Sequence, residues 1–79
     1  MTYRILTTYP RPGHATIQAC AGDPTRHHYD GKLRRLEEAG VDLDERDVTA
    51  KTSDEAVREV RRVLEACGYR VTVAGNVSG

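Results

Sequence analysis

The chain has 79 residues, of which 12 are Lys or Arg and 12 are Asp or Glu, so its formal net charge is zero. This length predicts one domain over residues 1–79, and the balanced charge argues against a protein that binds nucleic acid through a general basic excess. No segment approaches the ~18 consecutive apolar residues that cross a membrane, and no secretion signal is recognisable, so we expect a cytoplasmic protein. Phe and Trp are missing and the chain has only eight Val, five Leu and two Ile, which predicts a small core and modest stability.

The first third of the chain predicts a β-hairpin. Tyr3 to Tyr9 is rich in β-branched and aromatic residues, and His14 to Ala21 alternates between apolar and polar residues, both of which are typical of strands. Two prolines and a glycine lie between them, so we expect a loop of about four residues over 10–13. The apolar face of the second strand would consist of Ala15, Ile17 and Ala19.

A first helix is predicted to end at Gly40, since glycine readily accepts the left-handed conformation of a helix C-terminus. Its start has two alternatives. Asp23 with Pro24 fits a capped first turn, but Gly31 inside the helix would cost about 1 kcal/mol against alanine, which favours a later start with Asp30 as the cap. The apolar face comprises Tyr29, Leu33 and Leu36.

The segment 41–50 begins with apolar residues and then becomes strongly charged, which predicts an edge strand, because charge there discourages pairing with another chain. The second helix follows residues 52–55, which combine a capping side chain with acidic residues in the first turn. Its inward stripe is predicted to comprise Val57, Val60, Leu64 and Cys67, with Val63 beside it. Tyr69 to Ala74 is the last predicted strand, and 75–79 a flexible tail.

These elements predict an α/β (α+β) fold of order β-β-α-β-α-β, in which two helices cover one face of a mixed four-stranded sheet as a two-layer sandwich. The other face of the sheet would then be exposed. It would be lined either by Arg4, Leu6 and Thr8 or by Tyr3, Ile5 and Thr7.

The second half of the chain carries a family resemblance. The run KLRRLEEAGVD, followed by DVT and CGY, resembles the body of a glutaredoxin-like thioredoxin fold. Such proteins carry a Cys-x-x-Cys motif after their first strand, where this chain has residues 10–13. We therefore expect no redox activity from the resemblance.

Cysteine and histidine give weak signals for chemistry. Cys20 and Cys67 lie far apart and form no Cys-x-x-Cys motif, so we expect both to be small buried hydrophobic residues. His27 and Asp30 are three positions apart and could share a metal ion on a helix, but the sequence favours a solvated helix start, so we expect no metal site. The same holds for their polar neighbours, His14, Asp23 and His28. We expect no cofactor and no catalytic residues.

Arginine gives the chain a candidate partner-binding face. Five exposed arginines would gather there if the two helices packed side by side: Arg34, Arg35, Arg58, Arg61 and Arg62. Guanidinium groups suit phosphates and carboxylates, although interleaved glutamates are typical of a solvated face. Ten Arg against two Lys also indicate a GC-rich genome, such as that of an actinobacterium or one of its phages.

The hypothesis that these observations favour is a small non-catalytic binding module that docks a protein partner, or a second copy of itself, through the hairpin or the open sheet face. The alternative is a small nucleic-acid-binding regulator that uses the arginine face. A metal- or thiol-dependent enzyme is the third possibility.

Overall fold

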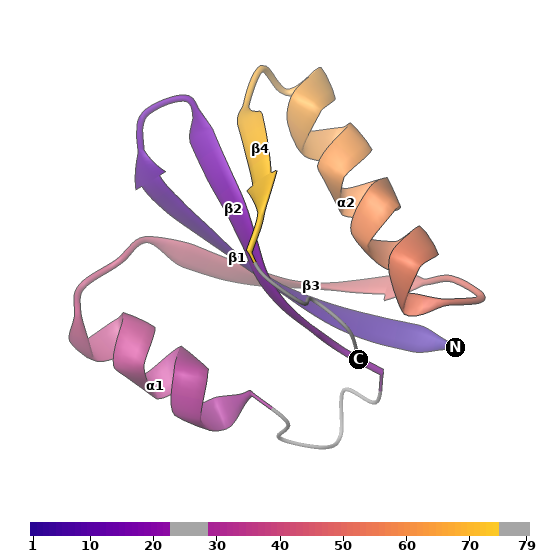
Figure 1. The fold of residues 1–79 in the computed structure, drawn as a ribbon, viewed down its shortest axis with the longest axis horizontal. Coiled ribbons are helices and arrows are strands. Elements are labelled where there is room, and N and C mark those ends of the chain that lie inside the picture. Colours follow the sequence, from indigo (N-terminus) through magenta and orange to yellow (C-terminus); the bar gives the residue numbers. More distant parts are fainter. Residues whose placement is uncertain (23–28, 75–79) are drawn as a thin grey trace.

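A computed structural model describes residues 1–22 and 29–74 (Figure 1). Its elements are β1 (Thr2–Arg11), β2 (His14–Ala21), α1 (Asp30–Glu38), β3 (Leu43–Thr49), α2 (Ser53–Ala66) and β4 (Arg70–Val73). The predicted order β-β-α-β-α-β is confirmed. The tail over 75–79, Asp23, Pro24 and both His27 and His28 fall outside the described residues. No helix among the described residues is long and apolar enough to cross a membrane.

The four strands form one mixed sheet in the order β3-β1-β2-β4, as the predicted fold class requires. β1 pairs antiparallel with both β2 and β3, whereas β2 and β4 are parallel. The charged strand β3 lies at one edge, as predicted, and the short strand β4 lies at the other. The two strands of the hairpin are therefore the central strands of the sheet.

The hairpin turn is tighter than predicted. β1 continues through Pro10 to Arg11, and only Pro12 and Gly13 form the turn, with Gly13 at φ 78°. A central strand tolerates Pro10 because the register between β1 and β2 shifts between Thr8 and Arg11, and a bulge is a place where a missing backbone N–H is accepted.

A second register shift changes which residues of β2 reach the core. Leu6 pairs with Ala19 but Thr7 pairs with Ile17, so Gln18 is an extra residue on β2. Beyond this bulge the two faces of the strand exchange. Cys20, rather than the predicted Ala19, joins the buried cluster, with 5% of its surface exposed.

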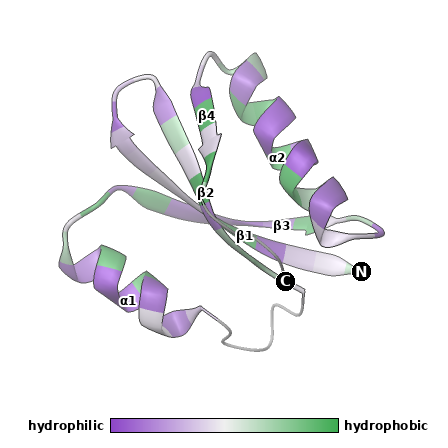
Figure 2. Cartoon of the chain, in the orientation of Figure 1, coloured by the Kyte–Doolittle hydropathy of each residue, from purple (hydrophilic) through white to green (hydrophobic). Residues whose placement is uncertain are grey.

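The second helix begins at a capped N-terminus, as predicted. Oγ1 of Thr52 accepts a hydrogen bond from the backbone N–H of Glu55 (3.2 Å), and the Glu55 carboxylate accepts one from the backbone N–H of Lys51 (3.1 Å). The buried stripe of this helix consists of Ala56, Val60 and Leu64. Hydrophobic and hydrophilic residues alternate along it turn by turn (Figure 2).

The first helix takes the later of the two predicted starts, since α1 begins at Asp30. The N-cap residue is Tyr29, whose side chain makes no capping hydrogen bond. Asp30 is the first helical residue rather than the cap. Gly40 follows the helix at φ 73°, which confirms its predicted role. No residue of α1 is fully buried, so α1 depends on contacts made by its half-buried side only.

The two helices lie on opposite faces of the sheet, which differs from the predicted placement on one face (Figure 1). The strands β2, β3 and β4 are parallel to one another. The chain crosses over β1 on its way from β2 to β3, and it then crosses back in the opposite direction from β3 to β4. Two right-handed crossovers in opposite directions place their helices on opposite faces. The pattern of elements was sufficient for the fold class, but the helix placement depends on the strand order.

Side-chain contacts agree with this arrangement. Tyr3 and Ile5 belong to the same buried cluster as the stripe of α2. On the other face, the Lys32 ammonium of α1 donates to the backbone carbonyl of Gln18 (2.9 Å). Leu6 and Thr8 on this second face are 0% and 3% exposed. The predicted open sheet face is therefore wrong at these two positions.

Candidate functional site

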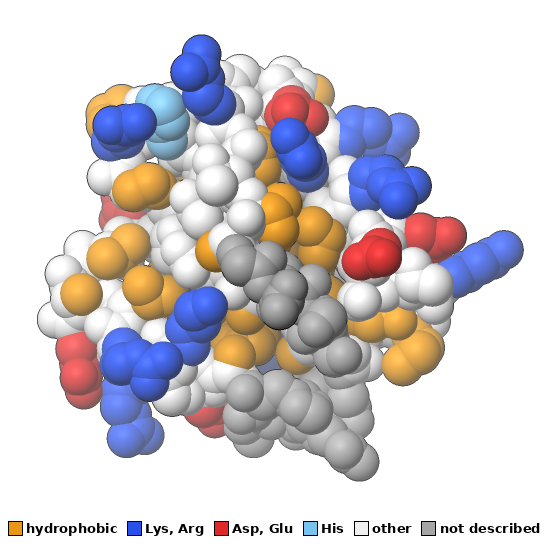
Figure 3. Space-filling view, viewed as in Figure 1, with side chains coloured by type: hydrophobic (Ala, Val, Ile, Leu, Met, Phe, Trp, Pro, Cys, Tyr) orange, Lys and Arg blue, Asp and Glu red, His pale blue; other side chains and the backbone are white. Residues whose placement is uncertain are grey.

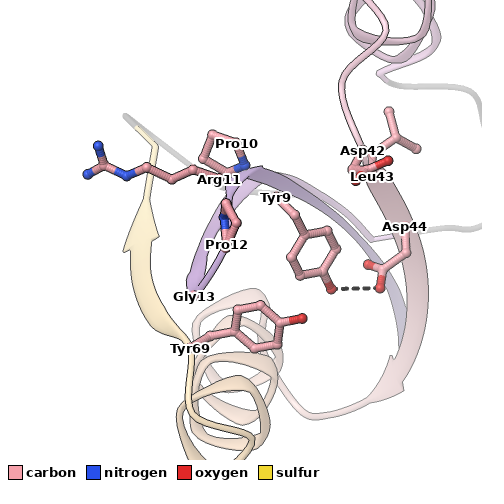
Figure 4. A pocket seen from close by; sticks show the side chains of 9 residues that line it. All are labelled: Tyr9, Pro10, Arg11, Pro12, Gly13, Asp42, Leu43, Asp44 and Tyr69. Carbon is pink, nitrogen blue, oxygen red and sulfur yellow. Dashed lines mark hydrogen bonds between the residues drawn. The ribbon is translucent and has the colours of Figure 1, made fainter.

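A groove of about 570 Å³ lies at the turn end of the hairpin (Figure 4). Three segments far apart in the sequence meet there: the end of β1 with its turn, the start of β3, and the residue before β4. The lining residues are Tyr9, Pro10, Arg11, Pro12, Gly13, Asp42, Leu43, Asp44 and Tyr69. Two aromatic rings, two prolines and two carboxylates thus share one concave surface.

Two tyrosines form the aromatic part of the groove. The ring centroids of Tyr9 and Tyr69 are 5.3 Å apart, and the ring planes are tilted by 51°, a separation typical of favourable aromatic pairs. Both residues are half-buried and pack against the core on the α2 face. Their hydroxyl groups point toward the Asp44 side of the groove (Figure 4).

A hydrogen bond fixes the first of these rings. The Tyr9 hydroxyl donates to Oδ2 of Asp44 at 2.7 Å. Burial and this hydrogen bond raise the pKa of Tyr9 to about 12, because both disfavour the phenolate. At neutral pH the tyrosine is therefore a hydrogen-bond donor that bridges the central strand β1 and the edge strand β3.

Asp44 retains unused capacity to accept hydrogen bonds. Its Oδ1 is buried and has no hydrogen-bond partner, and the same is true of Oγ1 of Thr7, its cross-strand neighbour. The Arg46 Nε lies 3.7 Å from Oδ2 of Asp44 and balances part of its charge. The Asp44 side chain as a whole remains 40% exposed.

Backbone hydrogen bonds hold the walls of the groove in place. The Tyr9 N–H donates to the carbonyl of Asp42 (2.8 Å), and the Arg70 N–H donates to the carbonyl of Gly13 (2.8 Å). These bonds join β3 and β4 to opposite sides of the hairpin. Because the sheet itself positions the lining residues, the groove exists without a ligand.

A second hollow of about 250 Å³ adjoins the groove and shares Gly13 and Tyr69 with it. Cys67 and Gly68 complete its lining. Cys67 is exposed, so the prediction that both cysteines are buried is correct only for Cys20. Cys67 is the C-cap of α2, and a residue at the end of a helix leaves the buried stripe even where the spacing fits.

The five candidate arginines do not form one patch. Arg34 and Arg35 belong to α1 and the other three to α2, on opposite sides of the sheet. Figure 3 shows basic side chains in separate groups over the two helices, with acidic side chains between them. Two of the α2 arginines are paired, Arg62 with Glu59 (2.6 Å) and Arg61 with Glu65 (3.7 Å).

The face of the sheet that carries α1 contains a further polar cluster. The Tyr29 hydroxyl donates to Glu45 (2.7 Å), and Arg4 donates to both carboxylate oxygens of Asp47 (2.9 and 3.4 Å). The hydrogen bond from Arg4 lowers the pKa of Asp47, and burial raises that of Tyr29. These contacts join α1 and β1 to β3, and their donors and acceptors are already engaged.

The described part of the fold shows no set of side chains suited to hold a metal ion. In residues 1–22 and 29–74, no three His, Cys, Asp or Glu side chains come close enough to hold an ion. Asp30 is exposed at the start of α1, and its suggested co-ligand His27 is not among the described residues.

The groove cannot be predicted from the sequence because its members are separated along the chain. The sequence places Tyr9 and Tyr69 in two different strands and Asp44 in an edge strand. Only the order β3-β1-β2-β4 brings the three together. The available signal was positional: each aromatic residue lies next to a glycine or proline turn, where strand ends converge.

No protein-family model, curated protein or solved structure is significantly similar to this chain. Function must therefore be argued from the geometry of the site.

Proposed function

We propose that this chain is a non-catalytic binding protein that docks an extended segment of a protein partner in the groove between Tyr9 and Tyr69. The observation that carries the proposal is the half-exposed pair of tyrosine rings in a preformed hollow. Concave sites with aromatic walls and a few polar groups are typical of binding sites, and tyrosine is enriched among the residues that dominate binding energy.

Preorganisation supports the proposal. Tyr9 lies on a central strand and its hydroxyl is fixed by Asp44. Side chains that are already ordered lose little conformational entropy when a partner binds. The groove can therefore bind a segment of a partner even though this contact would bury only a modest surface area.

Nucleic-acid binding has less support. The predicted arginine face depends on both helices lying on one side of the sheet. The three arginines of α2 are also interleaved with glutamates, and two of these glutamates form salt bridges with arginines of the same helix. Neutralised arginines release few counterions when they meet a phosphate backbone.

Affinity capture from a lysate of the organism that encodes the chain tests the proposal. Three baits are compared: the wild type, the groove variant Tyr69→Ala/Asp44→Asn, and the helix variant Arg58→Ala/Arg61→Ala/Arg62→Ala. We expect a protein that the wild type and the helix variant retain and that the groove variant loses. Circular dichroism checks that each bait is folded. If Tyr69→Ala unfolds, Asp42→Arg replaces it, since the side chain of this exposed rim residue makes no hydrogen bond or ion pair to a described residue.

Two results would contradict the proposal. Equal retention by the groove variant would exclude the groove as the docking site. Loss of retention by the helix variant, or release of the captured material by nuclease, would instead favour the arginine residues and nucleic acid.

A further inference from the structure

The groove combines two carboxylates with aromatic surface, and among the described residues only Asp44 has a cation beside it, Arg46, which is outside the lining at 3.7 Å. Asp42 is exposed at the rim, and Asp44 lies beside Tyr9. The lining cation is Arg11, and its side chain extends away from both tyrosines (Figure 4). The groove is thus electrostatically suited to a positive group from outside.

We infer, on the basis of the proposed function, that the docked partner segment carries an arginine whose guanidinium group lies against Tyr69 and between the carboxylates of Asp42 and Asp44. A cation over a tyrosine face is attracted by the negative face of the ring. A planar guanidinium also donates in a fork that matches carboxylates, which the compact lysine ammonium cannot do.

The groups already present in the groove leave room for this contact. Tyr9 and Arg46 both approach Oδ2 of Asp44, and Oδ1 is buried, so the more accessible carboxylate is that of the exposed Asp42. The Tyr69 hydroxyl makes no hydrogen bond to a described residue and is available as an additional acceptor. An arriving guanidinium can therefore bond to the Asp42 carboxylate and the Tyr69 hydroxyl without displacing a donor, while the partly exposed Asp44 carboxylate adds electrostatic attraction.

Cys67 offers a direct readout because it lies in the hollow on the other side of Tyr69. An extended segment that crosses Tyr69 would cover this exposed thiol. Cys20 is buried, and burial raises the pKa of its thiol, so it should react slowly and not obscure the signal.

The test measures the alkylation rate of Cys67 by iodoacetamide in the presence of short Ala/Ser peptides that differ only in one central residue. The residue is arginine, lysine or citrulline, the last being a neutral isostere of arginine. We expect saturable protection by the arginine peptide, and half-protection by the citrulline peptide only at about tenfold higher concentration, a difference of about 1.4 kcal/mol. The lysine peptide should be intermediate.

Matched variants locate the effect. Asp42→Asn/Asp44→Asn should abolish the preference for arginine over citrulline, and Tyr69→Leu should weaken protection by the arginine peptide. Glu37→Gln/Glu38→Gln removes the same number of charges from the exposed face of α1 and should leave the preference unchanged. Amide chemical-shift changes at Gly13, Asp44 and Tyr69 upon titration give an independent map.

The inference is overturned if the arginine and citrulline peptides protect equally, if neither protects, or if protection rises with the concentration of the chain alone, which would identify a second copy as the occupant. The proposed function stands separately. A captured partner that is lost by the groove variant, together with equal binding of the two peptides, would leave the docking function intact and reject only the arginine.

Discussion

The Tyr9 hydroxyl and the Asp44 carboxylate connect the central strand β1 to the edge strand β3 through a 2.7 Å hydrogen bond. This bond closes one side of the groove and adds to the effect of burial in raising the pKa of Tyr9. It also orients the ring that faces Tyr69. Four predictions follow from this and the other contacts described above.

Stability should fall at alkaline pH in part through Tyr9. Its pKa is about 12 in the fold against an ordinary value of 10.0. A raised pKa contributes stability that is complete below the unfolded value and is lost as the pH rises through the folded value. The free energy of unfolding should therefore decline between about pH 10 and 12. Tyr9→Phe should decline less over this range, in urea titrations at each pH. Identical slopes would contradict the prediction.

Leu64→Ala should destabilise the fold by ~2–4 kcal/mol, the usual range for a fully buried leucine, because Leu64 is 1% exposed at the centre of the α2 stripe. Chemical denaturation measures this change. Val63→Ala on the same helix is the matched control: Val63 is 38% exposed, and its loss should change stability by only about 0.5 kcal/mol. Equal effects of the two substitutions would mean that the buried face of α2 is misassigned.

The two cysteines should differ in reactivity. Cys67 is exposed and should react with a thiol reagent in the native protein, whereas Cys20 should react only after unfolding. Counting modified thiols by mass spectrometry before and after denaturation tests this. Two rapidly modified thiols in the native state would place Cys20 outside the core.

Self-association at moderate concentration stays a prediction, but its location changes. The hairpin strands, through which docking of a second copy was expected, are central and offer no free edge, whereas β4 is a short edge strand. The Arg70 N–H donates to the carbonyl of the turn residue Gly13 and the Ala74 N–H to that of Ile17 in β2. Alternation therefore directs the Val73 N–H outward. Val73→Pro should abolish association in sedimentation experiments over an about hundredfold concentration range, whereas Val73→Thr should not. Association unaffected by the proline would exclude this edge.

Local signals were sufficient to predict the elements, their order, the start of α2 and the end of α1, but not the N-cap of α1. Thr52 with Glu55 marks the start of α2, and Gly40 the end of α1, because capping depends on residues a few positions apart. The charged segment 43–49 was correctly placed at an edge.

Non-local features were not predictable in the same way. One extra residue at Gln18 exchanges the faces of β2, so Cys20 is buried where the simple alternation favours Ala19. The faces covered by the helices depend on the order of the strands, which no local pattern contains. The groove has the same origin, since its tyrosines come from separate strands.

The strand order also has a consequence for how the chain folds. The β1–β2 hairpin closes over a short loop, but β3 must return to β1 across α1, and β4 must reach β2 across α2. Long closures are slow compared with local ones. Tyr69 precedes the final strand and can meet Tyr9 only when that strand docks. A folding intermediate with an intact hairpin would therefore lack the groove, and binding competence should appear as the last kinetic phase.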